Sequence, residues 1–595
     1  MATSSDNPPA GTMVSSTSSL GLLYDDDGYI ETPGHPLSLD TPSRTGLLGR
    51  QVAGKEFLDA LFDYGTWENL IALVRNQASA ETVTGYFERH EIRRKRGRSL
   101  RVVNDRGFLD AFFPDPPASL VYTPNPPDIR YAWARHHRGT DGFALCGVTH
   151  TLCSQRAMEW LGQLLIGPFE PYDTMICTST AVLRMVRSVT NTYADFLRER
   201  MGGDPQVRPR LEVIPLGVDT EKYHPPSPEE RLVRREALGI GHDEVVVLFV
   251  GRLSHHTKAH PFPLFHALDR AATETGRKVR LILSGWAHNQ AVFQAFVEGA
   301  AAFASNVRVT VVDGTRPENR FAVWHAADIF SSLSDNIQET FGLVIAEAMA
   351  TGLPVVASDW DGYRDLVTDG ETGLLVPTLM IPGATTDSTA KLILEAHSYD
   401  HFLAETSQAV AVDCSSAVKA FSHLIVDESE RRRLGTVARR TALQRFAWAE
   451  VINAYERLWG EQEKVRQEHT RVRKGRPSSR GPTLYPNPEI AFEGYPSRWL
   501  AESDTLIAVP GATDRLDALL KSPLVTHAAW ARLSDPAALR ALLAKADGCT
   551  IEQLVAILTK QFLSQTTARA TLAWMLKYDL LRLSTPSGLR TMEST

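Results

Sequence analysis

Two glutamates that are able to bind a polar ligand, Glu339 and Glu347, have seven residues between them in a segment that reads ETFGLVIAE. Gly342 and the apolar residues after it predict a helix that ends at Gly352. We therefore expect Glu339 at the start of this helix and Glu347 two turns later, about 12 Å along the axis. Carboxylates placed in this way can hold both ends of one ligand, with a phosphate between them near the backbone N–H groups of Phe341 and Gly342. The alternative is an amphipathic helix with solvated glutamates.

Two cations follow a buried strand earlier in the chain. The apolar run Val245–Val250 is typical of such a strand and leads directly into Gly251 and Arg252, with Lys258 six residues further on. Open α/β sheets bind anions beyond the carboxyl ends of their strands. We expect an anion site here, although a loop with two surface cations is the alternative.

These residues need strands and helices to position them. Short apolar segments alternate with helical ones, which favours an α/β fold with mostly parallel sheets. The first series of expected strands is Leu20–Tyr24, Leu70–Val74, Leu100–Val103, Leu120–Tyr122, Phe143–Val148, Met175–Cys177 and Leu211–Ile214. The second series is Val245–Val250, Leu281–Leu283, Val307–Val312, Ile329–Phe330, Val355–Ala357 and Leu374–Val376. Two Rossmann-like domains are the simplest interpretation, with a ligand between the carboxyl ends of their strands.

Composition places the chain among ordinary globular proteins. It has 595 residues, of which 43% are hydrophobic and 22% charged, and its net charge of -7 gives no general nucleic-acid signal. Five cysteines without a Cys-x-x-Cys pair argue for reduced thiols. The start lacks the pattern of a signal peptide, and no apolar run is as long as a membrane span. We expect a cytoplasmic protein.

Several motifs occur in order: Pro-Leu-Gly-Val-Asp at 215–219, Gly-Arg at 251–252 with Lys258, the two glutamates, and Gly-Leu-Pro-Val-Val at 352–356. This order resembles family 4 of the retaining GT-B glycosyltransferases, from about Pro215 to Trp459. The resemblance is weaker from Leu20 to Pro215 and absent beyond Arg480. It implies a GT-B fold and a hexosyltransferase of carbohydrate biosynthesis that moves a sugar from a nucleoside-diphosphate sugar to an acceptor.

The resemblance also implies a role for each motif residue. Arg252 and Lys258, after Gly251, match the pair that neutralises the donor diphosphate. Glu347 matches the carboxylate that binds the nucleotide ribose, and Glu339 matches the residue that contacts the sugar hydroxyls. Backbone groups of Thr340, Phe341, Gly342 and Leu343 would complete the cradle for the phosphate and the sugar.

Other positions match the family pattern less closely. His150 stands where the family carries a histidine near the transferred sugar, although a structural histidine is the alternative. Arg316 follows an expected strand, and this position places it near the nucleobase of the donor. The Gly-Gly pair of the first loop has only Gly46 and Gly49 as counterparts. Asp-Gly-Tyr-Arg-Asp at 361–365 replaces the usual Gly-Gly and Glu, so we expect an unusual preference for the donor sugar.

The implied chemistry is the departure of a nucleoside diphosphate from an anomeric carbon. Negative charge then grows on the phosphate, where Arg252, Lys258 and helix amides stabilise it. The resemblance implies front-face attack with retention, the leaving phosphate acting as base, without a metal or another cofactor. The histidines between 255 and 266 do not suggest a metal site, because Pro261 and Pro263 prevent a helix from aligning them.

The expected domain order follows from the resemblance and from composition. It is a disordered tail (1–19), an acceptor-side Rossmann-like domain (20–219), a nucleotide-sugar-binding Rossmann-like domain (220–445), a helix crossing back to the first domain (446–468), a basic linker (469–490) and a small module (491–595). In the module, Thr550 and Gln553 predict a capping box, Thr567–Tyr578 a helix and Leu580–Leu583 a strand. This pattern favours a winged-helix-like module that binds a protein partner, since 522–583 lacks the dense basic face of a nucleic-acid reader.

Two alternatives concern function. An inactive, sugar-nucleotide-binding scaffold or regulatory protein would share the same motifs, although retention of both glutamates and both cations argues against it. The densest basic run, 89–101, suits peripheral contact with an anionic membrane or an acidic acceptor. A solvated face is the favoured interpretation of that run.

Overall fold

The computed structural model describes residues 19–24, 29, 49–104, 107–112, 115–138, 141–473, 486–526, 535–560 and 564–584. The chain divides into two compact units, Met1–Leu484 and Tyr485–Thr595. The expected tail up to residue 18 and the middle of the expected linker, 474–485, lie outside the described residues.

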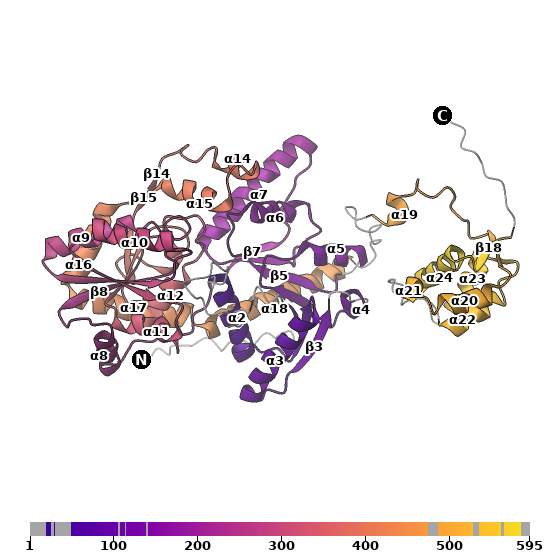
Figure 1. Ribbon diagram of the computed structural model, residues 1–595, viewed down its shortest axis with the longest axis horizontal. Helices are drawn as coiled ribbons and strands as arrows, with labels where there is room; N and C mark the ends of the chain where they lie inside the picture. The colour runs from indigo at the N-terminus through magenta and orange to yellow at the C-terminus, as the bar shows by residue number, and fades with distance from the viewer. Residues whose placement is uncertain are drawn as a thin grey trace, which may run out of the picture. The chain divides into compact units, whose positions relative to one another are not determined.

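The first domain has a parallel sheet of seven strands in the order β3-β2-β1-β4-β5-β6-β7 (Figure 1). The strands are β1 (Ser19–Leu23), β2 (Asn69–Val74), β3 (Ser99–Asn104), β4 (Leu120–Thr123), β5 (Ala144–Val148), β6 (Thr174–Cys177) and β7 (Arg210–Val213). The helices are α2 (Gly49–Tyr64), α3 (Gln77–Arg94), α4 (Phe108–Phe112), α5 (Ile129–Arg138), α6 (Gln155–Ile166) and α7 (Thr180–Met201). Helices cover both faces, because Leu70 and Ala72 of β2 belong to one core and Ile71 and Leu73 to the other.

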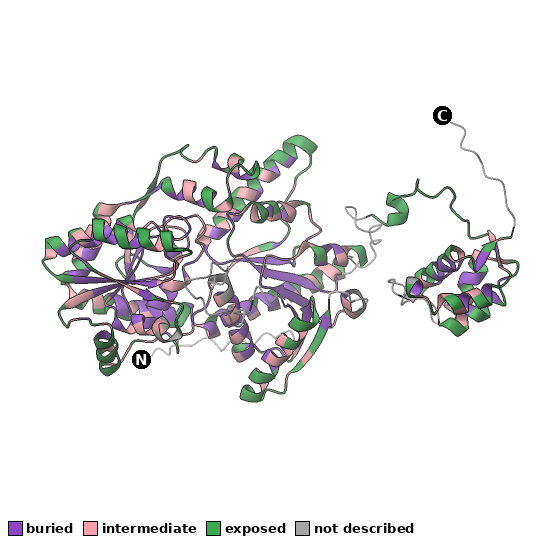
Figure 2. Ribbon diagram, viewed as in Figure 1, coloured by how far each residue is buried: buried purple, intermediate pink, exposed green. Residues whose placement is uncertain are grey.

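The second domain repeats this architecture with six parallel strands in the order β10-β9-β8-β11-β12-β13. The strands are β8 (Glu244–Val250), β9 (Lys278–Gly285), β10 (Arg308–Asp313), β11 (Ile329–Ser332), β12 (Val355–Ser358) and β13 (Gly373–Val376). The helices are α8 (Pro228–Ala237), α9 (Phe262–Thr275), α10 (Gln290–Phe303), α11 (Pro317–Ala326), α12 (Leu343–Thr351), α13 (Tyr363–Leu366), α16 (Cys414–Val426) and α17 (Glu428–Arg445). Figure 2 shows the strands of both sheets as mostly buried and the outer helix surfaces as exposed.

A short excursion leaves the second domain between β13 and α16. It contains β14 (Thr378–Met380), α14 (Ser388–Ile393), α15 (Tyr399–Gln408) and β15 (Val410–Val412), and its two strands pair antiparallel. Phe402 and Leu403 of α15 form a small apolar cluster with Leu392 and with Cys153 of the first domain. The excursion therefore links the two domains.

The helix α18 (Trp448–Arg473) returns from the second domain and packs beside α2 of the first (Figure 1). Trp459 is buried in the first-domain core, and Gln462 Nε2 donates to the carbonyl oxygen of Tyr172 at 2.9 Å. The helix continues past the expected boundary at 468, because His469 packs its ring against Tyr172 with a centroid separation of 5.3 Å. The first residues of the expected linker are therefore helical.

The second unit is a small, mainly helical module with an antiparallel sheet in the order β17-β16-β18. Its elements are α19 (Pro488–Ala491), β16 (Thr505–Ala508), α20 (Ala512–Leu519), α21 (Pro523–Thr526), α22 (Pro536–Leu543), β17 (Cys549–Thr550), α23 (Ile551–Thr559), α24 (Gln565–Lys577) and β18 (Leu581–Leu583). The expected capping box of Thr550 and Gln553 begins α23. Leu506, Leu554 and Leu572 belong to a core of the module's own.

The predicted fold class, two Rossmann-like α/β domains with a small mainly helical module, is confirmed. Every expected strand is present, and the five cysteines are free thiols. One local prediction is wrong: α12 begins at Leu343, so Glu339 lies in the turn before the helix and not at its start. In the part of the chain that the structure describes, none of the helices has the length and apolar character needed to cross a bilayer.

Candidate functional site

Lys258 and Glu339 form an ion pair beyond the carboxyl ends of strands in the second sheet, although 81 residues separate them in the chain. Both side chains are mostly buried, with 20% and 14% of their surfaces exposed. Burial alone raises the pKa of the Glu339 carboxyl, but the Lys258 ammonium and the backbone N–H groups of Thr340 and Phe341 outweigh it and lower the pKa. The Glu339 carboxyl is therefore ionised at neutral pH.

The turn before α12 holds Glu339 in place. Its last residue, Gly342, has φ +100°, and a Cβ there would lie 2.5 Å from Cε1 of Tyr363. The Tyr363 hydroxyl lies 2.8 Å from Ser332 Oγ and 3.4 Å from Glu339 Oε2. Because Gly342 has no side chain, Tyr363 can pack against the turn and bring its hydroxyl group close to the Glu339 carboxylate.

The backbone groups expected to bind the phosphate and the sugar have two different roles in the structure. The N–H groups of Thr340 and Phe341 bond the Glu339 carboxylate. Leu343 begins α12, and N–H groups at the start of a helix favour an anion where they have no acceptor in the helix; in this turn the Ile345 N–H already donates to the carbonyl oxygen of Gly342 at 2.8 Å. Glu347 lies further along the same helix and is 6% exposed.

Polar residues after β11 support the loop that carries Lys258. Ser334 Oγ donates to the Lys258 carbonyl oxygen at 3.1 Å, and Asn336 Nδ2 donates to the His256 carbonyl oxygen at 2.7 Å. Trp360 Nε1 in turn donates to the Asn336 carbonyl oxygen at 3.1 Å. The loops after β8, β11 and β12 are thereby fixed relative to one another.

Arg252 is connected to the first domain by a chain of side chains. Its Nη2 donates to Gln338 Oε1 at 3.0 Å, and Gln338 Nε2 donates to Tyr399 Oη at 3.2 Å. Tyr399 Oη lies 3.1 Å from Cys153 Sγ, in the loop after β5. Burial lowers the pKa of Arg252, but a guanidinium remains charged at neutral pH.

The carboxyl edges of the two sheets meet at this place. Ser179, which follows β6, donates through Oγ to the carbonyl oxygen of Thr340 at 2.8 Å. The backbone N–H of Thr180 donates to Asp365 Oδ2. The turn that carries Glu339 therefore touches the first domain directly.

The other predicted residues lie at the edges of the sheets. His150 follows β5, and its Nε2 lies 2.6 Å from the carbonyl oxygen of Pro124. Arg316 precedes α11 with its side chain 67% exposed, and its Nε lies 3.5 Å from Asp313 Oδ2. Gly49 is the first residue of α2, whereas Gly46 lies outside the described residues.

Much of the basic run at 89–101 is used within the first domain. Arg96 and Arg98 donate to carbonyl groups at the end of α2, where cations stabilise a helix. Arg98 also lies 4.1 Å from the ring centroid of Trp67. Asp63 pairs with two further arginines of the run. Several charges of the run are thus paired within the first domain. Contact of this run with a membrane stays a prediction.

The histidines after Arg252 contact neighbouring aromatic rings. His255 and His256 have ring centroids 4.9 Å apart, and His266 stacks on Phe262. Among the described residues, no cluster of three or more His, Cys, Asp or Glu side chains is suited to a metal ion.

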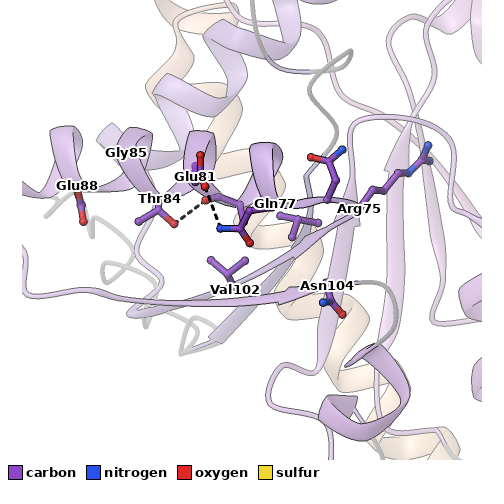
Figure 3. Close-up of a pocket in the computed structure, with 11 residues that line it drawn as sticks. Arg75, Gln77, Glu81, Thr84, Gly85, Glu88, Val102 and Asn104 are labelled. Atoms are coloured by element: carbon purple, nitrogen blue, oxygen red, sulfur yellow. Dashed lines mark hydrogen bonds between the residues drawn. The ribbon is translucent and has the colours of Figure 1, made fainter. Parts of the chain in front are cut away.

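A hollow of about 760 Å³ lies in the first domain beside β2, β3 and α3 (Figure 3). Arg75 and Asn104 line it at the carboxyl ends of the strands, and Glu81 and Glu88 line it from α3. None of the predicted donor-site residues is part of this lining, and two glutamates disfavour an anionic ligand. The hollow is therefore distinct from the ion-paired site.

Several residues of the site were missed from the sequence. The polar stretch from Ser334 to Gln338 directly follows a strand, and that position is itself a signal of a ligand site in α/β sheets. Ser179 and Tyr399 gave no comparable signal, because their role depends on contacts across the two domains.

Two Rossmann-like domains whose carboxyl edges meet, with a helix that returns from the second to the first, define the GT-B type of fold. Within this fold, residues 244–395 match the family model described as Glycosyl transferases group 1. That segment contains Arg252, Lys258 and both glutamates.

Individual relatives are similar to parts of the chain. The D-inositol 3-phosphate glycosyltransferase of Nocardia farcinica is 35% identical over 216 residues, which are 35% of this chain and 45% of the relative. The alpha-maltose-1-phosphate synthase of Mycolicibacterium smegmatis is 26% identical over 331 residues, 54% of this chain and 75% of the relative. The solved structure of Anabaena HepE in complex with UDP has a TM-score of 0.46 at 17% identity, covering 75% of this chain and 100% of that one. The chain spans about half the length of curated relatives such as the first of these.

Proposed function

We propose that this protein is a retaining family 4 glycosyltransferase that transfers a sugar from a nucleoside-diphosphate sugar to an acceptor. The observation that carries the proposal is the Lys258–Glu339 ion pair beside the start of α12, in the segment that matches the group 1 model. A buried ammonium, a neighbouring guanidinium and a helix N-terminus suit a pyrophosphate, and buried carboxylates suit hydroxyl groups.

Each charged side chain has a separate role in this proposal. Lys258 and Arg252 bind the diphosphate, Glu339 accepts hydrogen bonds from the sugar, and Glu347 binds the ribose. Because Lys258 is paired with Glu339, an arriving phosphate shares its ammonium with that carboxylate. The pair thereby connects the phosphate end of the donor to its sugar end.

The proposed mechanism needs no protein nucleophile. Negative charge on the leaving phosphate is stabilised by Lys258, Arg252 and the amides at the start of α12. The lowered pKa of Glu339 makes it a weak base, which favours transfer of the acceptor proton to the leaving phosphate. Attack and departure on the same face then retain the configuration. The two cations and the helix amides supply the charge that a metal ion would otherwise supply.

The first experiment identifies the nucleotide. Thermal shift of the full-length protein is measured with UDP, GDP and ADP, and then with the glucose and N-acetylglucosamine esters of whichever nucleotide binds. A ligand that binds only the folded protein raises the melting temperature. We expect one nucleotide to do so.

The second experiment measures hydrolysis and transfer of that donor by wild type and Lys258→Ala. Loss of one group that stabilises developing charge should lower turnover by about 100-fold or more. Lys278→Ala is the matched control, because Lys278 pairs with Asp243 at 2.7 Å at the amino end of β9 and should tolerate the change.

An inactive scaffold gives a different pattern. In that case the wild-type protein binds a sugar nucleotide, and Lys258→Ala weakens this binding, but neither hydrolysis nor transfer is detected with any acceptor. That result would contradict the proposed function.

As further parts of the proposal, the enzyme acts in the cytoplasm in carbohydrate biosynthesis, and its C-terminal module binds a protein partner.

A further inference from the structure

Asp361 occupies a backbone conformation that disfavours a side chain. Its φ is +51°, in the left-handed region where residues other than glycine are uncommon. The sequence also departs here from the Gly-Gly pair of the family that it resembles. Because such a conformation costs free energy for a residue with a side chain, the Asp361 carboxyl group is a candidate for a function.

One oxygen of the Asp361 carboxyl group has a hydrogen bond and the other does not. Oδ1 accepts from the backbone N–H of Gly362 at 2.5 Å. Oδ2 is buried and has no hydrogen-bond partner among the described residues. A buried polar atom without a partner is unfavourable, so a ligand that supplies the missing bond would gain affinity from it.

The surroundings of Asp361 include both domains. Its carboxyl group lies close enough to interact electrostatically with Glu339 and Lys258, and also with Cys153 of the first domain. The following residue packs on the turn that carries Glu339, since a Cβ at Gly362 would lie 2.6 Å from the carbonyl oxygen of Thr340. Asp361 therefore lies beside the carboxylate proposed to bind the sugar.

The surroundings shift the pKa values of the two carboxyl groups in opposite directions. Burial, and after it the negative charge of Glu339, raises the pKa of Asp361 well above its usual value. When this carboxyl group is protonated, its proton belongs on Oδ2, because Oδ1 accepts a hydrogen bond from Gly362. In that form Asp361 offers an O–H donor in the neighbourhood of the Glu339 carboxylate. A sugar hydroxyl group can accept from the first and donate to the second.

We propose that Asp361 determines specificity for the transferred sugar, with Oδ2 forming a hydrogen bond to one of its hydroxyl groups. This inference rests on the proposed function, because it assumes that the sugar of a sugar nucleotide lies beside Glu339. A glycine at this position would make no such contact. We therefore expect tighter binding of donor sugars that place a hydroxyl group within hydrogen-bonding distance of Asp361 Oδ2.

A cycle that combines protein variants with ligand analogues tests this contact. Calorimetric titration of the full-length protein compares the free nucleotide, its glucose ester and the monodeoxyglucose esters, for wild type and Asp361→Gly. Wild type should bind one deoxy analogue about tenfold more weakly than the glucose ester, as expected for one lost hydrogen bond. Asp361→Gly should show a smaller penalty for that analogue than wild type, because only the contact with Glu339 remains, and it should keep the wild-type affinity for the free nucleotide. Glycine is favoured at positive φ, so the variant should fold.

Two further variants make the outcome specific. Asp361→Asn keeps a hydrogen-bonding group at the same place and should retain part of the discrimination. Asp359→Asn is the control, because it removes an exposed ion pair with Arg364 at 2.5 Å in the same loop and should bind every ligand as wild type does. Identical penalties in wild type and Asp361→Gly for all analogues would overturn the inference and leave the proposed function intact. Absence of any nucleotide binding would contradict both this inference and the proposed function.

Discussion

Three carboxyl groups at one edge of the second sheet have pKa values shifted in different directions, although burial raises the pKa of each. The pKa of Glu339 is lowered, because Lys258 and two backbone N–H groups outweigh its burial. The pKa of Asp361 is raised, since burial and the nearby negative charge of Glu339 act in the same direction. Burial also raises the pKa of Asp335, to about 7. At the scale of single residues, the groups around each carboxyl decide the direction in which its pKa is shifted.

Asp335 makes the stability of the second domain depend on pH. Its side chain is buried, and its oxygens accept from the backbone N–H of His260 at 3.2 and 3.4 Å. Since the pKa rises from 3.8 to about 7 on folding, the folded state favours the protonated form. The stabilisation is complete below the unfolded value and is lost as the pH rises to about 7, by about 1.4 kcal/mol per pH unit.

The measurement is urea unfolding of wild type and Asp335→Asn between about pH 5 and pH 8. Relative to the variant, wild type should lose stability up to about pH 7 and then remain constant. Asp387→Asn, at an exposed position of the same domain, should follow the wild-type profile. A constant difference between wild type and Asp335→Asn at every pH would contradict the prediction.

At the scale of elements, a turn and not a helix carries the carboxylate that contacts Lys258. Gly342 ends this turn in a left-handed conformation and α12 starts immediately after it. Tyr363 packs against the glycine and also reaches Glu339 with its hydroxyl group. The turn, the tyrosine and the helix start therefore form one unit, and a change in the glycine should move the carboxylate.

Gly342→Ala tests this coupling. Alanine costs about 1–2 kcal/mol in a left-handed conformation, and here its Cβ would also lie 2.5 Å from the Tyr363 ring. We expect a lower melting temperature and a loss of donor turnover that exceeds the loss of nucleotide affinity. Gly370→Ala is the matched control, because Gly370 has φ +73° but open space around it. Equal effects of the two substitutions on turnover would show that the contact with Tyr363 does not matter.

At the scale of the whole molecule, the two Rossmann-like domains share one compact unit. The backbone N–H of Val218 donates to the carbonyl oxygen of Phe446 at 2.7 Å, so the two crossings between the domains run side by side. A Cβ at Gly217 would lie 2.2 Å from the ring of Trp448, the first residue of α18. The C-terminal module, in contrast, has a separate core around residues such as Leu554.

Removal of the module should leave the rest of the protein intact. A chain that ends at Leu484 keeps the whole first unit, including α18 and the ion-paired site. Domains with their own cores fold independently, so nucleotide affinity and donor hydrolysis should stay within about twofold of wild type. Calorimetry and a hydrolysis assay measure this. A truncated chain that loses nucleotide binding would show that the module takes part in the donor site.

The sequence by itself determined the order and type of the elements. Strand runs such as Val245–Val250 are apolar on both faces, which only a sheet covered by helices accommodates, so their alternation indicated two Rossmann-like domains. The motif around Glu339 and Glu347, with the cations after the strand, also indicated an anion site. Local patterns carry this information because burial and helix ends act on neighbouring residues.

Only the tertiary structure decided which groups meet and in which direction the pKa values of the carboxyl groups are shifted. Lys258 and Glu339 are far apart in sequence, and their pairing depends on the order β8-β11-β12 in the sheet. The chain from Arg252 to Tyr399 and Cys153 crosses two domains, which no local pattern can report. Burial and neighbouring charge set the pKa of each carboxyl, and both arise from residues that only folding brings together.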